Sequence, residues 1–350
     1  MSMDRDISQA LLEQVNQALN QATPLRIQGG NSKAMLGCPV AGEVLDTRSH
    51  RGIVSYDPTE LVLTARAGTP LREIEAALHE AGQMLPCEPP HLGPDATLGG
   101  MVAAGLSGPR RPWAGSVRDY VLGTRVITGY GKLLRFGGEV MKNVAGYDVS
   151  RLMAGSFGCL GLLTEVSLKV LPRPRLCLSL RLPMGRHQAL AELAEWGQQP
   201  LPISAACHDG DALYLRLEGG EGSVQSARQR LGGEALDSSF WSDLREQRLA
   251  FFAGPAPLWR LSVPNTTGEL DLPGQQLIDW GGAQRWLKST APAQHIREQV
   301  AKVGGHATCH APGAASSPPL PAALMRYHRA LKQQLDPQGV FNPGRLYPDL

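Results

Sequence analysis

Apolar residues recur at helical spacing in two segments near the start of the chain. Between residues 11 and 19 they form one stripe, which predicts a helix capped by Ser8. Residues 71–78 form a second stripe, for which Thr69 is the expected N-cap and Gly82 the residue just beyond the C-terminal end. Both segments are therefore expected to be amphipathic helices that pack one face against a core.

Short apolar runs between and after these helices predict β-strands. Residues 163–171 alternate cleanly, with Val166, Leu168 and Val170 on one face and polar residues on the other. Further strands are expected at residues 24–28, 45–47, 52–56 and 61–65, and at 121–128 and 133–136, which resemble a hairpin.

The pattern changes after Pro172-Arg173-Pro174, which we take as a domain boundary. Beyond it, strands near 176–182 and 212–217 alternate with helices near 186–197 and 223–231. A Pro/Ala/Ser-rich linker (311–321) precedes a last helix at 324–335. We therefore predict an α+β chain with domains at residues 1–174, 175–320 and 321–350.

Glycine and proline are both abundant, with 40 and 27 of the 350 residues. In a chain without repeats, this excess predicts tight turns and places where the backbone approaches another group closely. Residues 86–116 are rich in both, and a structureless loop of that length is uncommon inside a compact domain. We expect this stretch to be functional.

Charge and cysteine usage exclude several classes of protein. The formal net charge is +2 and no basic run gathers in one segment, which argues against a nucleic-acid partner. The polar N-terminus predicts no signal peptide, and no run of about 18 apolar residues suggests a membrane span. The six cysteines lie far apart without a C-x-x-C pair, which argues against an iron–sulfur or zinc cluster. Reduced thiols in a cytoplasmic protein are expected.

Three glycine-rich segments are candidates for chemistry. Gly29-Gly30-Asn31-Ser32 follows a predicted strand, and successive N–H groups in such a turn can bind a pyrophosphate; an ordinary turn is the alternative. Residues 96–108 would let the backbone lie against a flat ring or a phosphate, or they form a tightly packed helix start. Residues 155–164 hold a G-x-x-G-x-x-G turn that enters a strand, and here too a plain turn is the alternative.

Two common nucleotide-binding motifs are missing from the sequence. Neither G-x-G-x-x-G nor G-x-x-x-x-G-K-[ST] occurs. This argues against both a Rossmann-type NAD-dependent dehydrogenase and a P-loop NTPase.

The order and spacing of the glycine-rich segments resemble the FAD-binding domain of the vanillyl-alcohol oxidase/p-cresol methylhydroxylase (PCMH) superfamily. The resemblance covers residues of about 20–175 and 325–350. Asp336-Pro337 with Asn342-Pro343-Gly344 is typical of the branch that oxidises D-2-hydroxy acids, and 141–148 with a short cap region is similar to the FAD-binding subunits of bacterial glycolate oxidases. The motifs are Gly29-Gly30-Asn31-Ser32, Thr97-Leu98-Gly99-Gly100, Gly146-Tyr147-Asp148 with Arg151-Leu152, Gly155-Ser156-Phe157-Gly158-Cys159-Leu160-Gly161 and Phe341-Asn342-Pro343-Gly344-Arg345.

This resemblance implies a fold and a cofactor. The fold is a two-subdomain PCMH-type FAD-binding domain, a smaller α+β cap over the flavin ring, and a C-terminal segment that returns to the FAD domain. The implied FAD contacts are the backbone of Gly29, Gly30, Asn31, Ser32 and Lys33 at the pyrophosphate; Pro90, His91, Thr97, Gly99, Gly100 and Gly105 along the ribityl chain and ring; Gly155, Gly158, Gly161 and Leu162 at the adenosine half or pyrophosphate; and Asn342 and Arg345 at the ring.

Two departures from the family affect the mechanism. The hydroxy-acid branch usually has Glu where this chain has Phe157, so a carboxylate contact is missing. The H-x-G-D-G-N-x-H metal and base motif of catalytic relatives is also missing. His306 and His310 come nearest, but on a strand they would lie about 13 Å apart, too far for one ion. No metal site is expected, and no residue is assigned as a catalytic base.

The resemblance therefore implies a subunit of a glycolate (D-2-hydroxy acid) oxidase that works only within a complex. Hydride would pass from the substrate to flavin N5, and electrons would pass on through a sister flavoprotein subunit and an iron–sulfur subunit. Peripheral association with the inner membrane face would come through those partners. The alternatives are a free-standing FAD-linked oxidase of another small alcohol or acid, and a non-catalytic structural subunit. Four tryptophans, Trp241, Trp259, Trp280 and Trp286, are expected to be core or interface anchors.

Overall fold

A computed structural model describes residues 5–139, 146–310 and 318–350. Contacts group the chain into two compact units. Unit 1 comprises Met1–Ser107, Gly115–Pro172 and Pro319–Leu350, and unit 2 comprises Gly108–Ala114 and Arg173–Pro318. These units follow from contacts between residues and do not test what each part of the chain does. The FAD-binding role of residues 1–174 and the substrate-side role of residues 175–320 therefore stay predictions.

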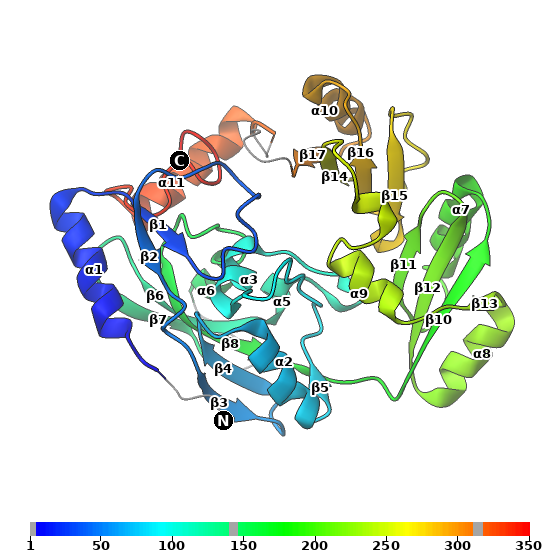
Figure 1. The fold of residues 1–350 in the computed structure, drawn as a ribbon, viewed down its shortest axis with the longest axis horizontal. Helices are drawn as coiled ribbons and strands as arrows, with labels where there is room; N and C mark the ends of the chain where they lie inside the picture. The colour runs from blue at the N-terminus through cyan, green and yellow to red at the C-terminus, as the bar shows by residue number, and fades with distance from the viewer. Residues whose placement is uncertain (1–4, 140–145, 311–317) are drawn as a thin grey trace. The chain divides into compact units, whose positions relative to one another are not determined.

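Unit 1 contains a five-stranded antiparallel sheet (Figure 1). The predicted hairpin is confirmed, since β6 and β7 pair antiparallel. Helices α2 (Leu71–Glu80), α3 (Leu98–Ala104) and α5 (Val117–Tyr120) contribute their apolar faces to the same core as the sheet. The strand order is β3 (Ile53–Asp57), β4 (Val62–Arg66), β8 (Leu162–Lys169), β6 (Val121–Ile127) and β7 (Leu133–Gly137).

A second core in unit 1 joins the two ends of the sequence. Helix α1 (Ser8–Gln21) covers the parallel pair β1 (Leu25–Gln28) and β2 (Glu43–Asp46). Phe341, from the tail after α11 (Ala322–Leu335), is fully buried in this core and forms a β-bridge with Leu25. The segment that follows α11 in Figure 1 thus pairs with β1. The predicted return of the C-terminal segment is therefore confirmed.

Both predicted N-caps are wrong by one position, whereas Gly82 is the residue just beyond the C-terminal cap of α2, as predicted. Ser8 is the first residue of α1, and the Asp6 carboxylate accepts the Ser8 N–H at 2.8 Å instead. Pro70 takes the N-cap position of α2, because its ψ of 135° is extended. The Thr69 hydroxyl accepts the Gly52 N–H at 2.9 Å, so it joins two loops rather than capping the helix.

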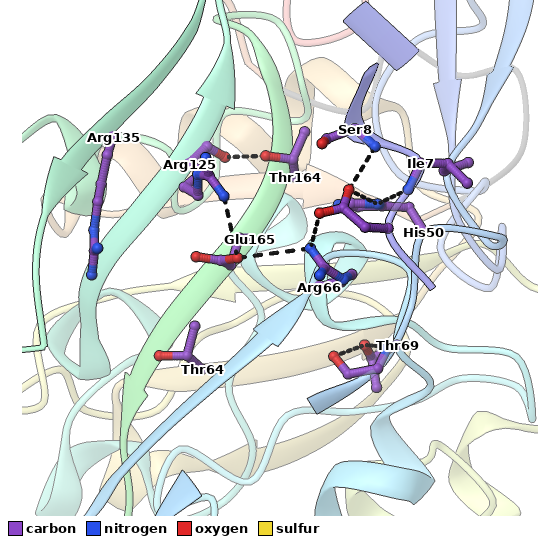
Figure 2. A network of polar contacts seen from close by, with 12 residues as sticks. Ile7, Ser8, His50, Thr64, Arg66, Thr69, Arg125, Arg135, Thr164 and Glu165 are labelled. Atoms are coloured by element: carbon purple, nitrogen blue, oxygen red, sulfur yellow. Dashed lines mark hydrogen bonds and ion pairs between the residues drawn. The ribbon is translucent and has the colours of Figure 1, made fainter. Parts of the chain in front are cut away.

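A polar network crosses the sheet of unit 1 (Figure 2). Glu165 on β8 lies between Arg66 on β4 and Arg125 on β6, at 3.9 and 3.8 Å. Arg66 also pairs with Asp6 at 3.0 Å, and the Ile7 N–H donates to His50 Nδ1. The carboxylate of Glu165 thus separates two arginines on the strands that flank β8. The contacts of Asp6 and Ile7 also fix the start of the described chain to the sheet.

Unit 2 is built on an eight-stranded antiparallel sheet, of which the sequence patterns identified only two strands. Every residue of β11 (Ile203–His208) is buried. Ala206 packs in the core with α7 (Arg186–Trp196) and α8 (Glu221–Leu231), whereas Ala205 and Cys207 pack with α9 (Ser239–Arg245). Burial on both faces removes the alternation that reveals a strand. The strand order is β13 (Glu234–Ala235), β10 (Leu176–Pro183), β12 (Ala212–Gly219), β11, β15 (Gln275–Asp279), β16 (Gln284–Lys288), β14 (Leu258–Ser262) and β17 (His306–Cys309).

The Gly/Pro-rich stretch 86–116 is structured. It contains α3, α4 (Arg111–Ala114) and Ser116, the N-cap residue of α5, while its residues 108–114 belong to unit 2. Arg110 forms a two-pronged ion pair with Glu218, at 2.8 and 2.6 Å. None of the described helices has the length and apolar character needed to cross a bilayer. The remaining elements are β5 (Gln83–Met84), α6 (Val149–Leu152), β9 (Leu171–Pro172), η1 (Ala250–Phe252), η2 (Trp280–Gly282) and α10 (Ala293–Lys302).

Candidate flavin site

Unit 1 has a cleft with about 450 Å³ of free space where the three glycine-rich segments meet. Seven of the predicted contact residues line it, and so do six residues that the sequence did not single out. The predicted ones are Gly29, Gly99, Gly100, Gly158, Gly161, Leu162 and Asn342, and the others are Ile27, Thr47, Ala67, Ala103, Phe157 and Leu163.

The loop after β1 presents a row of backbone donors. Among the described residues, the N–H groups of Gly30, Asn31 and Ser32 donate to no protein acceptor. Asn31 has a φ of 55°, the left-handed conformation that turns successive N–H groups toward one side. A Cβ on Gly30 would lie 1.5 Å from the Asp95 carbonyl oxygen, so this glycine is required by packing against the neighbouring loop. The loop can therefore bind an anion through its backbone.

Helix α3 begins at the cleft, and its two glycines serve different purposes. The Thr97 hydroxyl caps the helix by accepting the Gly100 N–H at 3.3 Å. A Cβ on Gly99 would lie 2.8 Å from the Ala67 Cβ, so Gly99 allows close packing against the strand end. A Cβ on Gly100 would meet only the Thr97 hydroxyl, at 3.2 Å. The two alternatives for residues 96–108 thus both apply. Gly99 belongs to a tightly packed helix start, and Gly100 leaves the wall of the cleft open.

The third segment, residues 155–161, is docked on the end of α3. The Phe157 N–H donates to Ala103 O at 2.9 Å and the Gly155 N–H donates to Val102 O at 3.0 Å. Phe157 has a φ of 52°, and it lines the cleft at the position where hydroxy-acid relatives usually carry Glu. An apolar ring therefore replaces a carboxylate there.

Asn342 joins the first and third segments. Its Oδ1 accepts the Ile27 N–H at 2.8 Å, and its Nδ2 donates to Phe157 O at 2.7 Å. With a φ of 41°, its backbone is left-handed, a conformation that asparagine tolerates better than most residues. Asn342 is 5% exposed and lines the cleft.

A buried ion pair holds the tail that carries Asn342. Lys332 Nζ lies 2.6 Å from Asp336 Oδ2 and donates to the carbonyls of Cys159 and Phe341, both at 2.8 Å. Asp336 in turn accepts the N–H groups of Val340 and Phe341. Asp336 therefore fixes the backbone that leads to Asn342, so the first part of the tail motif positions the second.

Comparisons with known proteins fit this geometry. An FAD binding domain family model matches residues 8–137. The glycolate oxidase subunit GlcE of Escherichia coli (strain K12) is 66% identical over 350 residues, which cover 100% of both chains. The chain belongs to the GlcE family of glycolate oxidase subunits.

More distant relatives match only part of their own length. The glycolate oxidase subunit GlcD of Bacillus subtilis (strain 168) is 34% identical over 138 residues, 39% of this chain and 29% of that protein. A D-lactate dehydrogenase of Anaerostipes hadrus is 33% identical over 142 residues, 41% of this chain and 30% of that one. The solved structure of an alkyldihydroxyacetonephosphate synthase superposes with a TM-score of 0.68 at 18% identity, over 96% of this chain and 75% of that one. Together with the FAD binding domain match, these likenesses confirm the predicted PCMH-type fold.

The other predicted contacts of this GlcE-family chain lie around the cleft rather than in its lining. Lys33 Nζ donates to His91 O at 3.1 Å, which joins the residue 29–33 loop to the segment containing Pro90. Arg345 donates to the carbonyls of Cys38 and Ala34, at 2.9 and 3.2 Å. Burial lowers the pKa of Arg345. Its predicted contact with the flavin ring stays a prediction, as do those of Lys33, Pro90 and His91.

Two glycines of the predicted set pack against each other. A Cβ on Gly105 would lie 3.0 Å from the Cα of Gly155, and both residues have positive φ, at 65° and 82°. Gly155 instead lines an apolar hollow next to α11, together with Leu331 and Leu346. The structure thus gives Gly105 a packing role between α3 and the third segment.

The cleft residues that the sequence missed carry no motif. Ala67 and Thr47 end or follow strands, and Ala103 and Leu163 are ordinary apolar residues of a helix and a strand. Phe157 was noted only as a departure from the family. Their positions follow from the folding of neighbouring segments, so the identity of each residue alone gave no signal. Residues 141–145 of the glycolate-oxidase-like motif lie outside the described residues.

No metal-binding group of three or more His, Cys, Asp or Glu side chains occurs in the described parts of the GlcE-family chain. His306 lies on strand β17 and His310 directly follows it. Burial and the nearby Arg260 lower the pKa of His310 to about 3 and lower that of His306. Neither imidazole is poised to accept a proton near neutral pH. All six cysteines are free thiols.

Proposed function

We propose that this chain is the FAD-holding subunit of a multi-subunit glycolate oxidase. The observation that carries the proposal is the cleft of unit 1, which is lined by Gly29 and by the side-chain-free wall at Gly100. Directly after Gly29, the N–H groups of Gly30, Asn31 and Ser32 have no protein acceptor among the described residues. Similarity over the full length of a glycolate oxidase subunit supports the same function.

The residues present fit FAD. The donors of the 29–32 loop would hold the negatively charged pyrophosphate, because backbone N–H groups in a left-handed turn bind anions without needing a charged side chain. Gly100 and Phe157 would face the flat parts of the cofactor. Asn342 would keep the segment of Phe157 at a fixed separation from the strand end at Ile27. Bound FAD would supply the hydride acceptor that the oxidation of a 2-hydroxy acid needs.

The chain's own residues offer binding and orientation more clearly than proton transfer. Among the described residues, no histidine lines the cleft, and the His-rich motif of catalytic relatives is missing from the sequence. We therefore assign at least the acid–base part of the oxidation to a sister flavoprotein subunit. An iron–sulfur subunit would carry the electrons onward. The proposed location is the cytoplasm, with contact to the inner membrane face through these partners.

Gly100→Ala tests the cleft directly. The added methyl group meets only the Thr97 hydroxyl, and alanine favours a helix, so the fold should be retained while the cofactor wall is blocked. We expect the variant to purify with less than about a tenth of the wild-type flavin absorbance, which corresponds to a loss of about 1.4 kcal/mol or more in binding. Gly222→Ala, in α8 of unit 2 with open space around its Cβ position, is the matched control and should keep full flavin content.

The wild-type chain alone should show a flavin spectrum but little turnover of glycolate. Vigorous glycolate oxidation by the isolated chain would contradict the division of labour between subunits and favour a free-standing oxidase. A wild-type protein that stays colourless with added FAD would overturn the proposed cofactor role and favour a structural subunit.

A further inference from the structure

Unit 2 contains a cluster of charged side chains around Trp280, which we call the Trp280 cluster. Two guanidinium groups lie over the indole ring, with the Cζ of Arg111 at 4.5 Å and that of Arg260 at 5.0 Å from the ring centroid. Gln284 and Asp279 complete the cluster. Arg111 comes from residues 108–114, the short segment that belongs to unit 2 although the residues on either side of it belong to unit 1. The ion pair between Arg110 and Glu218 fixes this segment to unit 2.

The tryptophan is held rigidly. It is 5% exposed and has a φ of 55°, an unfavourable conformation for an aromatic residue. The Asp279 carboxylate accepts its N–H at 2.7 Å, and its indole Nε1 donates to Gly108 O at 3.0 Å. A strained residue persists only where its surroundings fix it, and such residues are found often at ligand sites.

Arg260 is held in one orientation with its outer edge unused. Its Nε donates to Gln284 Oε1 at 2.6 Å, and Gln284 is itself oriented by donating Nε2 to Asp279 Oδ2 at 3.0 Å. Among the described residues, the two terminal nitrogens of Arg260 have neither a hydrogen-bond acceptor nor an ion-pair partner. This edge has the two parallel donors that a carboxylate accepts.

Asp279 balances the charge of Arg260 only in part. Burial and the like charge of Arg111 lower the pKa of Arg260 to about 10. Burial raises the pKa of Asp279 to about 7, so this carboxyl is only a partial counter-charge at neutral pH. His306 and His310 have lowered pKa values and are neutral there. The imbalance favours an anionic ligand.

We propose that Arg260, supported by Arg111 on the Trp280 ring, binds the carboxylate of a small 2-hydroxy acid on unit 2. The proposal rests on the proposed function, since that function defines the acid, and it assigns substrate binding to this chain as well. Gln284 and Asp279 act as positioning residues for the guanidinium.

Calorimetric titration of the full chain with glycolate tests the proposal, with flavin absorbance measured on the same samples. Arg260→Gln should weaken glycolate binding at least tenfold and leave flavin content unchanged, and Arg260→Lys should recover only part of the affinity because a lysine lacks the two-pronged edge. Arg181→Gln removes an exposed arginine from the same unit and should bind glycolate like wild type. Should Arg260→Gln fail to fold by circular dichroism, Arg111→Gln at the exposed side of the cluster should show a smaller loss of affinity.

Several results would overturn the proposal. These are a wild-type chain that carries flavin but binds no glycolate, an Arg260→Gln variant that folds and binds as tightly as wild type, or inorganic phosphate bound as tightly as glycolate. The last result would indicate a general anion site. A colourless chain that still binds glycolate through Arg260 would contradict the proposed FAD role but not the proposed glycolate site. Failure of the FAD proposal and failure of the glycolate-site proposal therefore give different results.

Discussion

The cleft of unit 1 and the Trp280 cluster of unit 2 are built from different parts of the chain. The cleft is made by backbone groups and by glycines that keep its walls close, as at Gly30 and Gly99. The Trp280 cluster is made by long side chains from three distant segments, with Arg111, Arg260 and Trp280 at its centre. The first needs particular residues at fixed spacings along the sequence, whereas the second needs only that the fold bring its side chains together.

The two regions also treat charge differently. Behind the cleft, Lys332 and Asp336 form a buried pair in which every charged group has several partners. At the Trp280 cluster, the Asp279 carboxyl that acts on Arg260 has its pKa raised to about 7. A balanced pair stabilises a fixed structure, while an unbalanced cluster leaves room for a charged ligand.

The largest effect is expected from Lys332→Met. The substitution leaves the Asp336 carboxylate fully buried without its cation, and loss of one partner of a buried pair costs about 3–5 kcal/mol. The free energy of unfolding should fall by that amount in a denaturant titration, and flavin should be lost because the tail no longer holds Asn342. As a control, Lys302→Met removes an exposed lysine from α10 and should change little. A stable Lys332→Met chain with full flavin content would show that the tail does not depend on this pair.

A smaller effect is expected at Asn342, where side chain and backbone can be separated. Asn342→Ala removes both hydrogen bonds and keeps a Cβ in a left-handed conformation, so about 1–3 kcal/mol of stability should be lost. Asn342→Gly removes the same bonds but accommodates the φ of 41°. Thermal unfolding should rank wild type above the glycine variant and the glycine variant above the alanine variant. Equal melting temperatures for the two variants would show that backbone strain contributes nothing.

An effect that depends on pH is expected at the Trp280 cluster. The folded-state pKa of Asp279 is raised by burial to about 7, above its ordinary value of 3.8, so the folded chain binds this proton more tightly than the unfolded chain. Its contribution to stability is therefore present below about pH 4 and is lost as pH rises through 7, with a slope of order 1 kcal/mol per pH unit. The melting temperature of Asp279→Asn should therefore rise relative to that of wild type as pH increases from about 4.5 to about 8.

Asp209 provides the control of opposite sign. Burial opposes it, but hydrogen bonds from Tyr214 and from two backbone N–H groups lower the pKa of Asp209 below its ordinary value. Its contribution is present at neutral pH and is lost on acidification, so Asp209→Asn should lose stability relative to wild type as pH rises from acid to neutral. Parallel pH curves for wild type and Asp279→Asn would contradict the buried-carboxyl interpretation.

How much the sequence could predict depended on how a segment is buried. The hairpin of β6 and β7 was predicted because its strands and turn carry local signals, and the stripes of α1 and α2 were visible for the same reason. In unit 2, β11 was missed because helices cover both faces and remove its alternation. The helix caps moved by one residue, since Thr69 bonds to Gly52, a partner that only the folded chain places beside it.

By itself, the sequence indicated the cleft that is built from backbone groups. A left-handed turn residue, or a close approach between two backbone segments, restricts which residue types can occupy a position. These restrictions appear in the sequence as spaced glycines. The resemblance of its motifs to PCMH-type proteins also implied that the tail after Asp336 belongs to the same site. Only the tertiary structure decided which glycines serve packing and which face the cleft, as between Gly99 and Gly100. Only the tertiary structure brought Arg111 and Arg260 onto Trp280, because long side chains meet through the fold and leave no fixed spacing in the chain.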